Sequence, residues 1–156
     1  MSQHEDLVER FYLAFAARDA GAMATCYHPD VHFRDEVFDL KGAEASGMWR
    51  MLCAKGKDLR MEHSFIRTEG DVVRAHWEAH YTFSASGRQV HNIMEAKFRF
   101  ADNRIIEHID QFDFYRWSKQ ALGAPGLLLG WTPYLRSKVQ AKANAQLQAF
   151  LKKSQV

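Results

Sequence analysis

The sequence predicts a single α+β domain, in which three helices come first and a strongly curved, mainly antiparallel sheet follows. Between residues 5 and 56, apolar side chains recur at intervals of three and four, as on one face of a helix. Between residues 59 and 115 they alternate with a period of two, as on one face of a strand. Helical spacing returns after residue 117. We expect one domain over 1–156, with a core over 5–117 and a C-terminal helical extension over 118–156.

The N-terminal helices are bounded by clear signals. The first is expected over 5–17, where an apolar stripe follows early acidic residues. A second, short helix is expected over 20–28, where Pro29 stops it because proline disfavours helix in the residue before it. A short strand at 31–33 and a third helix over 43–56 complete this part.

Four long strands are expected to form a meander, because turn-forming residues separate the alternating segments. These segments are 59–67, 72–83, 89–100 and 104–115. The alternation places Phe65 on the same face as His63. It places His108 and Asp110 on one face of the last strand and Ile105 on the other.

The C-terminal part is expected to contain a short helix, an apolar loop and a longer helix. The loop, at 124–131, is interrupted by glycine and proline, and its role as a lid, a dimer contact or a membrane-surface contact stays open. The long helix should begin near Thr132, with Pro133 at its first position.

Composition narrows the functional classes. The aromatic fraction of 13% suits a core or cavity lined with rings. A net charge of +2 with no basic cluster on one face argues against nucleic-acid binding. Cys26 and Cys53 have no metal-ligand spacing and are interpreted as free, buried thiols in a reducing compartment. No signal peptide and no integral membrane segment is expected, which favours a cytoplasmic protein.

Several polar residues fall on the apolar faces of the predicted strands, namely His63, Tyr81, Asn92, His108 and Asp110. A carboxylate in an apolar concavity is costly unless it is paired, so its presence needs a partner or a purpose. His108 and Asp110 lie two positions apart on one face and make a candidate acid/base pair. The alternative is a buried hydrogen-bonded pair that only stabilises the sheet.

Large side chains are expected to line the same concavity as substrate-binding or core residues. The set comprises Phe11, Phe33, Trp49, Trp77, Met94 and Phe112, together with Tyr81 and Asn92 as polar contacts.

The opposite face of the sheet is mixed in charge and rich in histidine. Three isoleucines expected there, Ile93, Ile105 and Ile109, favour a homodimer contact about as much as a solvated surface. His76 and His80 are awkwardly spaced along one strand for a shared metal ion, so no metal site is expected.

Two segments, LVERFYLAFAARDAGAMATCYHPDVHFRD and HNIMEAKFRFADNRIIEHIDQFD, resemble the nuclear transport factor 2-like superfamily over roughly residues 5–117. This superfamily includes ketosteroid isomerase, scytalone dehydratase, limonene epoxide hydrolase and the SnoaL-like polyketide cyclases, and the sequence is most similar to the SnoaL-like group. The resemblance implies a cone-shaped roll with a small-molecule pocket and no cofactor.

The resemblance also implies roles for single residues. Asp35 stands where ketosteroid isomerase has its general base, but Phe11 and Ala96 stand where that enzyme has its oxyanion-hole donors, so steroid isomerase activity is not expected. His63 is similar in position to a catalytic histidine of scytalone dehydratase, and Asp110 to the acid/base Asp of SnoaL-like cyclases. The Arg–Asp pair of the epoxide hydrolases is missing.

These observations favour a cofactor-free acid/base enzyme acting on a small hydrophobic carbonyl or hydroxyl compound, by isomerisation, dehydration or cyclisation. Its catalytic candidates are Asp110, His108, Asp35 and His63. The alternatives are a small-molecule-binding module without chemistry and a dimerisation scaffold with a filled core.

Overall fold

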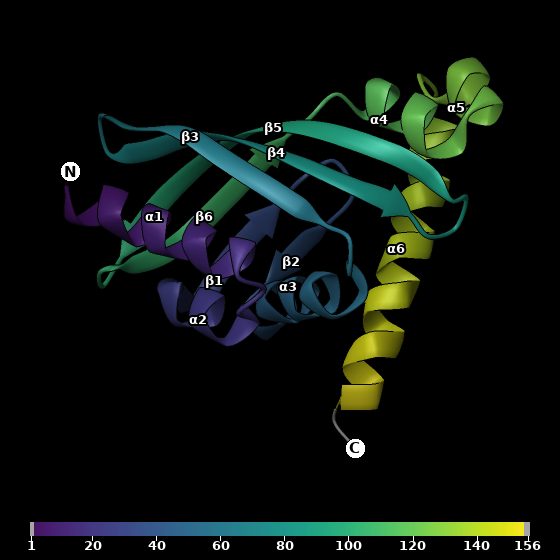
Figure 1. The fold of residues 1–156 in the computed structure, drawn as a ribbon. Coiled ribbons are helices and arrows are strands. Elements are labelled where there is room, and N and C mark those ends of the chain that lie inside the picture. The colour runs from purple at the N-terminus through teal and green to yellow at the C-terminus, as the bar shows by residue number, and fades with distance from the viewer. Residues whose placement is uncertain (1, 155–156) are drawn as a thin grey trace.

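The computed structural model describes residues 2–154, which form a strongly curved six-stranded sheet and six helices (Figure 1). The helices are α1 (Gln3–Ala16), α2 (Ala20–Cys26), α3 (Ala43–Lys55), α4 (Phe114–Leu122), α5 (Ala124–Leu129) and α6 (Pro133–Ser154). The strands are β1 (Tyr27–Arg34), β2 (Asp39–Lys41), β3 (Arg60–Glu69), β4 (Val72–Phe83), β5 (Arg88–Ala101) and β6 (Arg104–Gln111). The predicted α+β class is confirmed.

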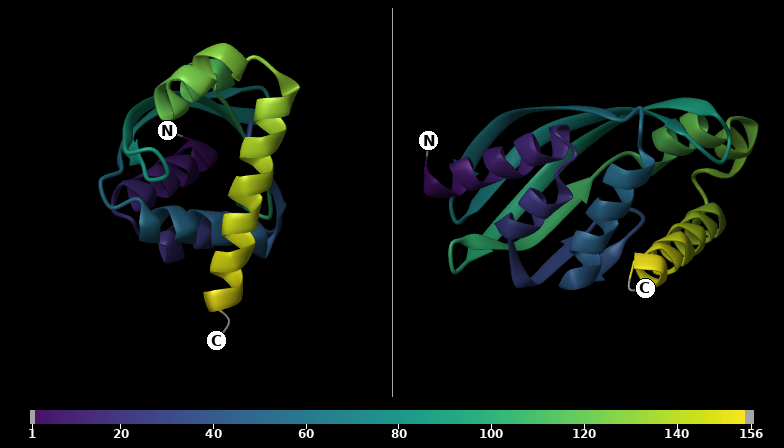
Figure 2. Two further views of the ribbon diagram at one scale, coloured as in Figure 1. Left: turned by 90° about the vertical axis from the view of Figure 1, so that its right-hand side faces the viewer. Right: turned by 60° about the horizontal axis from the view of Figure 1, so that its bottom comes forward.

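The N-terminal helices pack on the inner face of the sheet (Figures 1 and 2). A capping box starts α1, in which Ser2 and Glu5 exchange side chain to backbone hydrogen bonds at 3.1 Å each. The apolar stripe of α1 is buried against the strands, and Phe11 and Tyr12 are almost completely enclosed.

The sheet has the order β2-β1-β6-β5-β4-β3. Strands β3 to β6 form the predicted antiparallel meander, while β1 joins β6 in parallel and β2 pairs with β1 at the edge. The three-residue strand β2 was not predicted, because three residues are too few to show an alternating pattern.

The second helix ends earlier than the sequence suggests. α2 stops at Cys26, and Tyr27 already pairs with Ile105 of β6, so the expectation of helix up to His28 is wrong. Burial of Tyr27 against the sheet outweighs the local helical pattern. Pro29 lies inside β1 on its exposed side, beside a break in the pairing with β6.

Two β-bulges reverse the predicted faces of two residues. At the bulge in β3, Phe65 adopts a left-handed backbone (φ 54°) and is 76% exposed, while the next residue, Ile66, packs on the core. In β6, the extra residue Ile106 shifts the register, so Ile105 turns inward and is fully buried. The predictions of an inward Phe65 and an outward Ile105 are therefore wrong.

The segment expected as a loop at 124–131 contains the short helix α5. Its glycines serve a close helix contact, because a Cβ at Gly126 would lie 1.9 Å from the carbonyl oxygen of Ser118 in α4. The outward side of this segment is apolar, and Leu128 and Trp131 are 67% and 73% exposed. The long helix starts at Pro133, as predicted.

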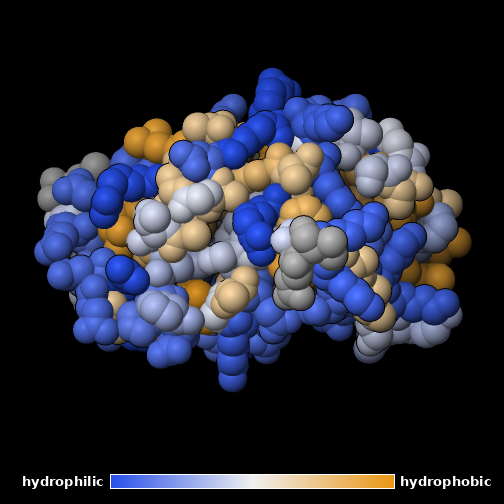
Figure 3. All heavy atoms as spheres, turned by 90° about the horizontal axis from the view of Figure 1, so that it is seen from below, coloured by the Kyte–Doolittle hydropathy of each residue, from blue (hydrophilic) through white to orange (hydrophobic). Residues whose placement is uncertain are grey.

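Helix α6 runs along α3 and the turn that follows β1 (Figure 2). Gln140 and Asn144 donate side-chain hydrogen bonds to the carbonyl oxygens of Glu36 and Val37. The molecular face that carries α2, α3 and the end of α6 is largely hydrophilic, with scattered apolar groups (Figure 3). None of the helices formed by residues 2–154 is long and apolar enough to cross a membrane.

Candidate active site

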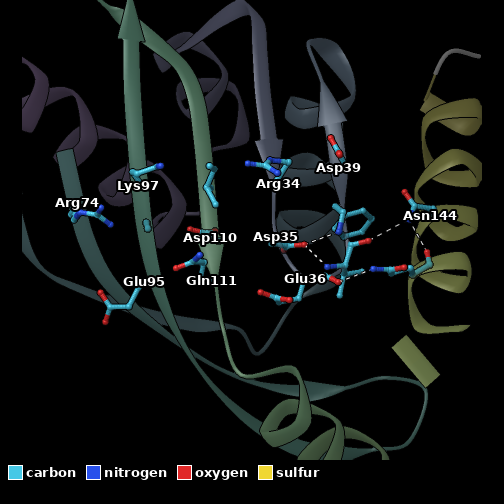
Figure 4. A pocket seen from close by; sticks show the side chains of 15 residues that line it. Arg34, Asp35, Glu36, Asp39, Arg74, Glu95, Lys97, Asp110, Gln111 and Asn144 are labelled. Carbon is cyan, nitrogen blue, oxygen red and sulfur yellow. Dashed lines mark hydrogen bonds between the residues drawn. The ribbon is translucent and has the colours of Figure 1, made fainter. Parts of the chain in front are cut away.

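A pocket of about 770 Å³ lies where β1 leaves the sheet (Figure 4). Its lining comes from the end of β1, the turn after it, the start of β2, one residue of β4, the middle of β5, the end of β6, and α6. Most of these residues are polar, and the charged ones are Arg34, Asp35, Glu36, Asp39, Arg74, Glu95, Lys97 and Asp110. The expectation of an apolar pocket is corrected here, because apolar contact is limited to Val37, Phe38, Ala96 and Ile109.

Strand topology explains why two carboxyl groups meet in this pocket. The parallel pairing of β1 with β6 ends at Arg34 and Ile109, so the next inward residue of β6, Asp110, has a strand neighbour only on the β5 side. The turn after β1 brings Asp35 to the vacant side. Figure 4 shows the side chains of Asp35 and Asp110 in the lining of the same pocket, with the hydrogen bonds of Asp35 running to the turn after β1.

The turn itself fixes the Asp35 carboxyl group. Its Oδ1 atom accepts hydrogen bonds from the N–H groups of Val37 and Phe38, at 2.7 Å each. Burial raises the pKa of Asp35 from 3.8 to about 7; the negative charges of Asp110 and Glu36 add to this, and the two N–H groups oppose it. Asp35 can therefore gain or lose a proton near neutral pH.

Asp110 ends a chain of buried hydrogen bonds. Its Oδ1 atom lies 3.0 Å from Nε2 of His108 and accepts a hydrogen bond from the indole N–H of Trp77 at 3.2 Å. The other nitrogen of His108, Nδ1, lies 2.8 Å from the Tyr27 hydroxyl oxygen, which accepts the indole N–H of Trp49 at 2.8 Å. His108 is completely buried and Asp110 is 2% exposed.

The donors of this chain assign the histidine tautomer. The Trp49 indole can only donate, so the Tyr27 hydroxyl oxygen accepts this hydrogen bond. Burial raises the pKa of Tyr27 well above its usual value, so the hydroxyl group keeps its proton. Tyr27 can therefore donate that proton in a hydrogen bond to Nδ1 of His108. A proton on Nε2 of His108 then faces the Asp110 carboxylate. The reverse tautomer would turn an imidazole lone pair toward that carboxylate.

Most of the predicted substrate contacts lie in the packed core instead of the pocket. Phe11, Phe33, Trp49, Trp77 and Met94 are each at least 95% buried, and none of them lines the pocket. Aromatic rings surround His108, with the Phe98 centroid 4.3 Å and the Phe33 centroid 5.0 Å from the imidazole. The aromatic hollow is filled by its own side chains.

The remaining predicted residues do not line the pocket. His63 stacks on Tyr12 and contacts the carboxylate of Glu9 at 3.0 Å. Tyr81 accepts the indole N–H of Trp117 at 2.8 Å. Asn92 is buried and Phe112 is half-buried, and neither lines the pocket.

Two tyrosines near the site were not singled out from the sequence. Tyr27 was assigned to a helix, and only recognition of a longer β1 would have placed its hydroxyl beside the last strand. Tyr12 is 1% exposed, and its hydroxyl has no hydrogen-bond partner among residues 2–154.

The curved open sheet with helices on its inner face is the fold of nuclear transport factor 2-like proteins. The family model of the SnoaL-like domain matches residues 8–108. The chain therefore belongs to the SnoaL-like family. A search of curated proteins found no match.

Solved structures share this fold at low sequence identity. A nuclear transport factor 2-like protein of unknown function from Burkholderia pseudomallei has a TM-score of 0.67 and 17% identity, over 78% of this chain and 99% of that one. IdmH from Streptomyces antibioticus, assigned as a polyketide cyclase, has a TM-score of 0.64 and 22% identity over 76% and 98%. An LEH-like epoxide hydrolase from Mycobacterium tuberculosis has a TM-score of 0.62 and 20% identity over 81% and 92%.

Proposed function

We propose that this protein is an acid/base enzyme that moves a proton on a small carbonyl or hydroxyl compound, with Asp35 and Asp110 as its catalytic pair. The observation that carries the proposal is the meeting of these two carboxyl groups in one pocket, with the pKa of Asp35 raised to about 7. Proton transfer is most efficient when the pKa of the transferring group lies near the working pH.

Asp35 suits the role of the group that exchanges a proton with the substrate. Its Oδ1 atom is held by two backbone N–H groups, which leaves Oδ2 to reach a ligand. As a carboxylate it would remove a proton from carbon next to a carbonyl group. As a carboxylic acid it would return that proton to another carbon, or to a departing hydroxyl group that leaves as water.

Asp110 suits the role of its partner. Two N–H donors engage Oδ1, and no hydrogen bond among residues 2–154 engages Oδ2. His108 and Tyr27 would act as positioning residues, because they lie behind the carboxylate and outside the pocket lining. His63, which was expected near the reacting atom, has no place in this mechanism.

The pocket lining indicates the kind of substrate. Val37 and Phe38 offer a limited apolar contact. Arg34, Lys97 and Ile109 form one row on the outer face of the sheet and reach the rim of the pocket, where the first two add positive charge. We expect a compact molecule with an apolar body and an oxygen function that becomes negative during reaction. Phe11 and Ala96 are buried and carry no donor, so a steroid isomerase mechanism is not proposed.

Deuterium exchange tests this proposal without knowledge of the natural substrate. A panel of small enolisable cyclic ketones, including 2-tetralone, is incubated with the protein in D₂O, and the loss of α-proton signals is followed by NMR. We expect the protein to accelerate exchange, and Asp35→Asn or Asp110→Asn to reduce the rate by about 10²- to 10⁴-fold.

The matched control is Asp39→Asn, which changes a carboxyl group of the same pocket whose side chain contacts His32. Exchange at the parent rate in both catalytic variants would contradict the proposal. Broadening of ketone signals by binding, with no acceleration of exchange across the panel, would favour the binding module instead.

A homodimer through the outer face of the sheet and a cytoplasmic location are further proposals. Ile93 is exposed on that face at 38%, and Ile109 is half-buried there, but the buried Ile105 does not contribute. Light scattering over a range of concentrations measures the oligomeric state, and a monomer at every concentration would exclude the dimer.

A further inference from the structure

The outer face of the sheet gathers histidine and glutamate side chains on two neighbouring strands. His80 of β4 stands directly opposite His91 of β5, and Glu78 lies two residues before His80, on the same face. The two imidazole rings are stacked with their centroids 4.1 Å apart. Cross-strand pairing therefore brings together three residues that are scattered in the sequence.

The three side chains present ligand atoms at metal-binding separations. One atom each from Glu78, His80 and His91 lies within 4.8 Å of the other two, and the Glu78 Oε1 to His91 Nε2 distance is already 2.6 Å. Bonds of about 2.0–2.1 Å to zinc place neighbouring ligand atoms about 3.4 Å apart. To bind one ion, the Glu78 and His91 atoms have to move apart and more distant ligand atoms have to move closer. The two imidazole rings also have to turn out of their parallel stack, because each nitrogen lone pair lies in the plane of its ring. All three side chains are only partly buried, which leaves them room to rotate.

A second layer of contacts orients the carboxylate. His76 binds the other Glu78 oxygen through Nε2 at 2.7 Å, and its Nδ1 lies 2.5 Å from Glu95. Outer-shell partners of this kind fix the orientation of a ligand and raise metal affinity.

The backbone under the cluster is also well fixed. β4 and β5 pair without a register shift from Val73 to Phe83. From α4, Gln120 accepts the backbone N–H of His91 at 2.6 Å, and Arg116 donates to the His91 carbonyl oxygen at 2.6 Å. Because the backbone is already ordered, metal binding costs little backbone conformational entropy, and this favours binding.

We propose that Glu78, His80 and His91 form a binding site for one divalent transition-metal ion, with zinc as the best fit. Two imidazoles and a carboxylate are ligands that zinc accepts, and three protein ligands leave a further position for water or another ligand. The site is separate from the candidate active site, because none of the three residues lines that pocket. The expectation that this face holds no metal rested on His76 and His80, whereas the proposed site pairs residues from two strands.

Calorimetric titration of the metal-free protein with ZnCl₂, slightly above neutral pH, tests the site. We expect one Zn²⁺ per chain, and a large loss of affinity in His80→Ala and in His91→Ala. His76→Phe should weaken binding less, by about 10- to 100-fold, as expected for an outer-shell partner. Co²⁺ in place of Zn²⁺ should give visible absorption that both alanine variants lose.

The matched control is His28→Asn, which removes a histidine that contacts Asp102 at the β5–β6 turn. It should bind Zn²⁺ as the parent does, and circular dichroism verifies that every variant is folded. Parent affinity in both alanine variants, or an absence of Zn²⁺ binding by the parent, would overturn the site. Asp35→Asn should bind Zn²⁺ as the parent does, even though it should lose deuterium exchange. Failure of the metal site and failure of the proposed acid/base function can therefore be distinguished.

Discussion

The two ends of the buried hydrogen-bond chain differ in what they offer a ligand. At the Trp49 end, Tyr27 and His108 are enclosed by aromatic rings that leave no room for another molecule. At the Asp110 end, the pairing of β6 with β1 stops and Asp110 lines a pocket together with Asp35. A polar side chain that points inward is thus not automatically a site residue, since access depends on where the sheet opens.

The largest expected effect lies at the closed end. His108→Leu removes the partner of both the Tyr27 hydroxyl and the Asp110 carboxylate, which stay buried. We expect the free energy of unfolding to fall by about 3–5 kcal/mol, measured by urea denaturation. His63→Leu, which removes one part-buried contact to Glu9, should cost clearly less. Equal losses would show that the buried chain is no more important for stability than an ordinary ion pair.

The second prediction concerns the open end. The raised pKa of Asp35 means that the folded state holds its proton up to about pH 7, whereas the unfolded chain releases it near the ordinary value of 3.8. The free energy of unfolding should therefore fall as pH rises from about 4 to 7, by up to about 4 kcal/mol, and then stay lower.

Asp35→Asn keeps an oxygen for the N–H groups of Val37 and Phe38 but cannot ionise. Urea denaturation at about pH 8 should find this variant more stable than the parent, with the difference vanishing near pH 4. If the free energy of unfolding depends on pH in the same way in the parent and in this variant, the pKa of Asp35 is not raised.

The smallest expected effect compares two buried tyrosines. Tyr12→Phe removes a hydroxyl without a partner among residues 2–154 and should raise the free energy of unfolding by about 1 kcal/mol. Tyr27→Phe removes a hydroxyl with two partners and should lower it by about 1–2 kcal/mol. Thermal denaturation should shift in opposite directions, and shifts of the same sign would contradict the assigned contacts.

The sequence predicted the helices other than α5, although it made α2 too long, and it predicted the four-stranded meander and the inward direction of His108 and Asp110, because these follow from local periodicity. It failed where one inserted residue changes the face, as at Ile105 and Phe65, since a bulge leaves no mark in the alternation.

The nature of the pocket was harder to predict from the sequence. Whether Trp49 and Trp77 line a cavity or fill it depends on side-chain packing in three dimensions, which periodicity does not describe. The meeting of Asp35 with Asp110 was accessible only through the resemblance to related enzymes, because the two residues lie far apart in sequence. The outer-face cluster needed the strand register, which brings His80 opposite His91.

The hydrogen bonds from α6 to the turn after β1 bear on how the C-terminal tail shapes the pocket. Gln140 and Asn144 line the pocket, yet they lie beyond the stretch, residues 8–108, that the chain shares with the family model. Proteins that keep the same carboxyl pair but carry a different tail would enclose a differently shaped space. If Asp35 and Asp110 act as proposed, exchange of tails between relatives would alter which compounds the pocket admits while these two residues stay in place.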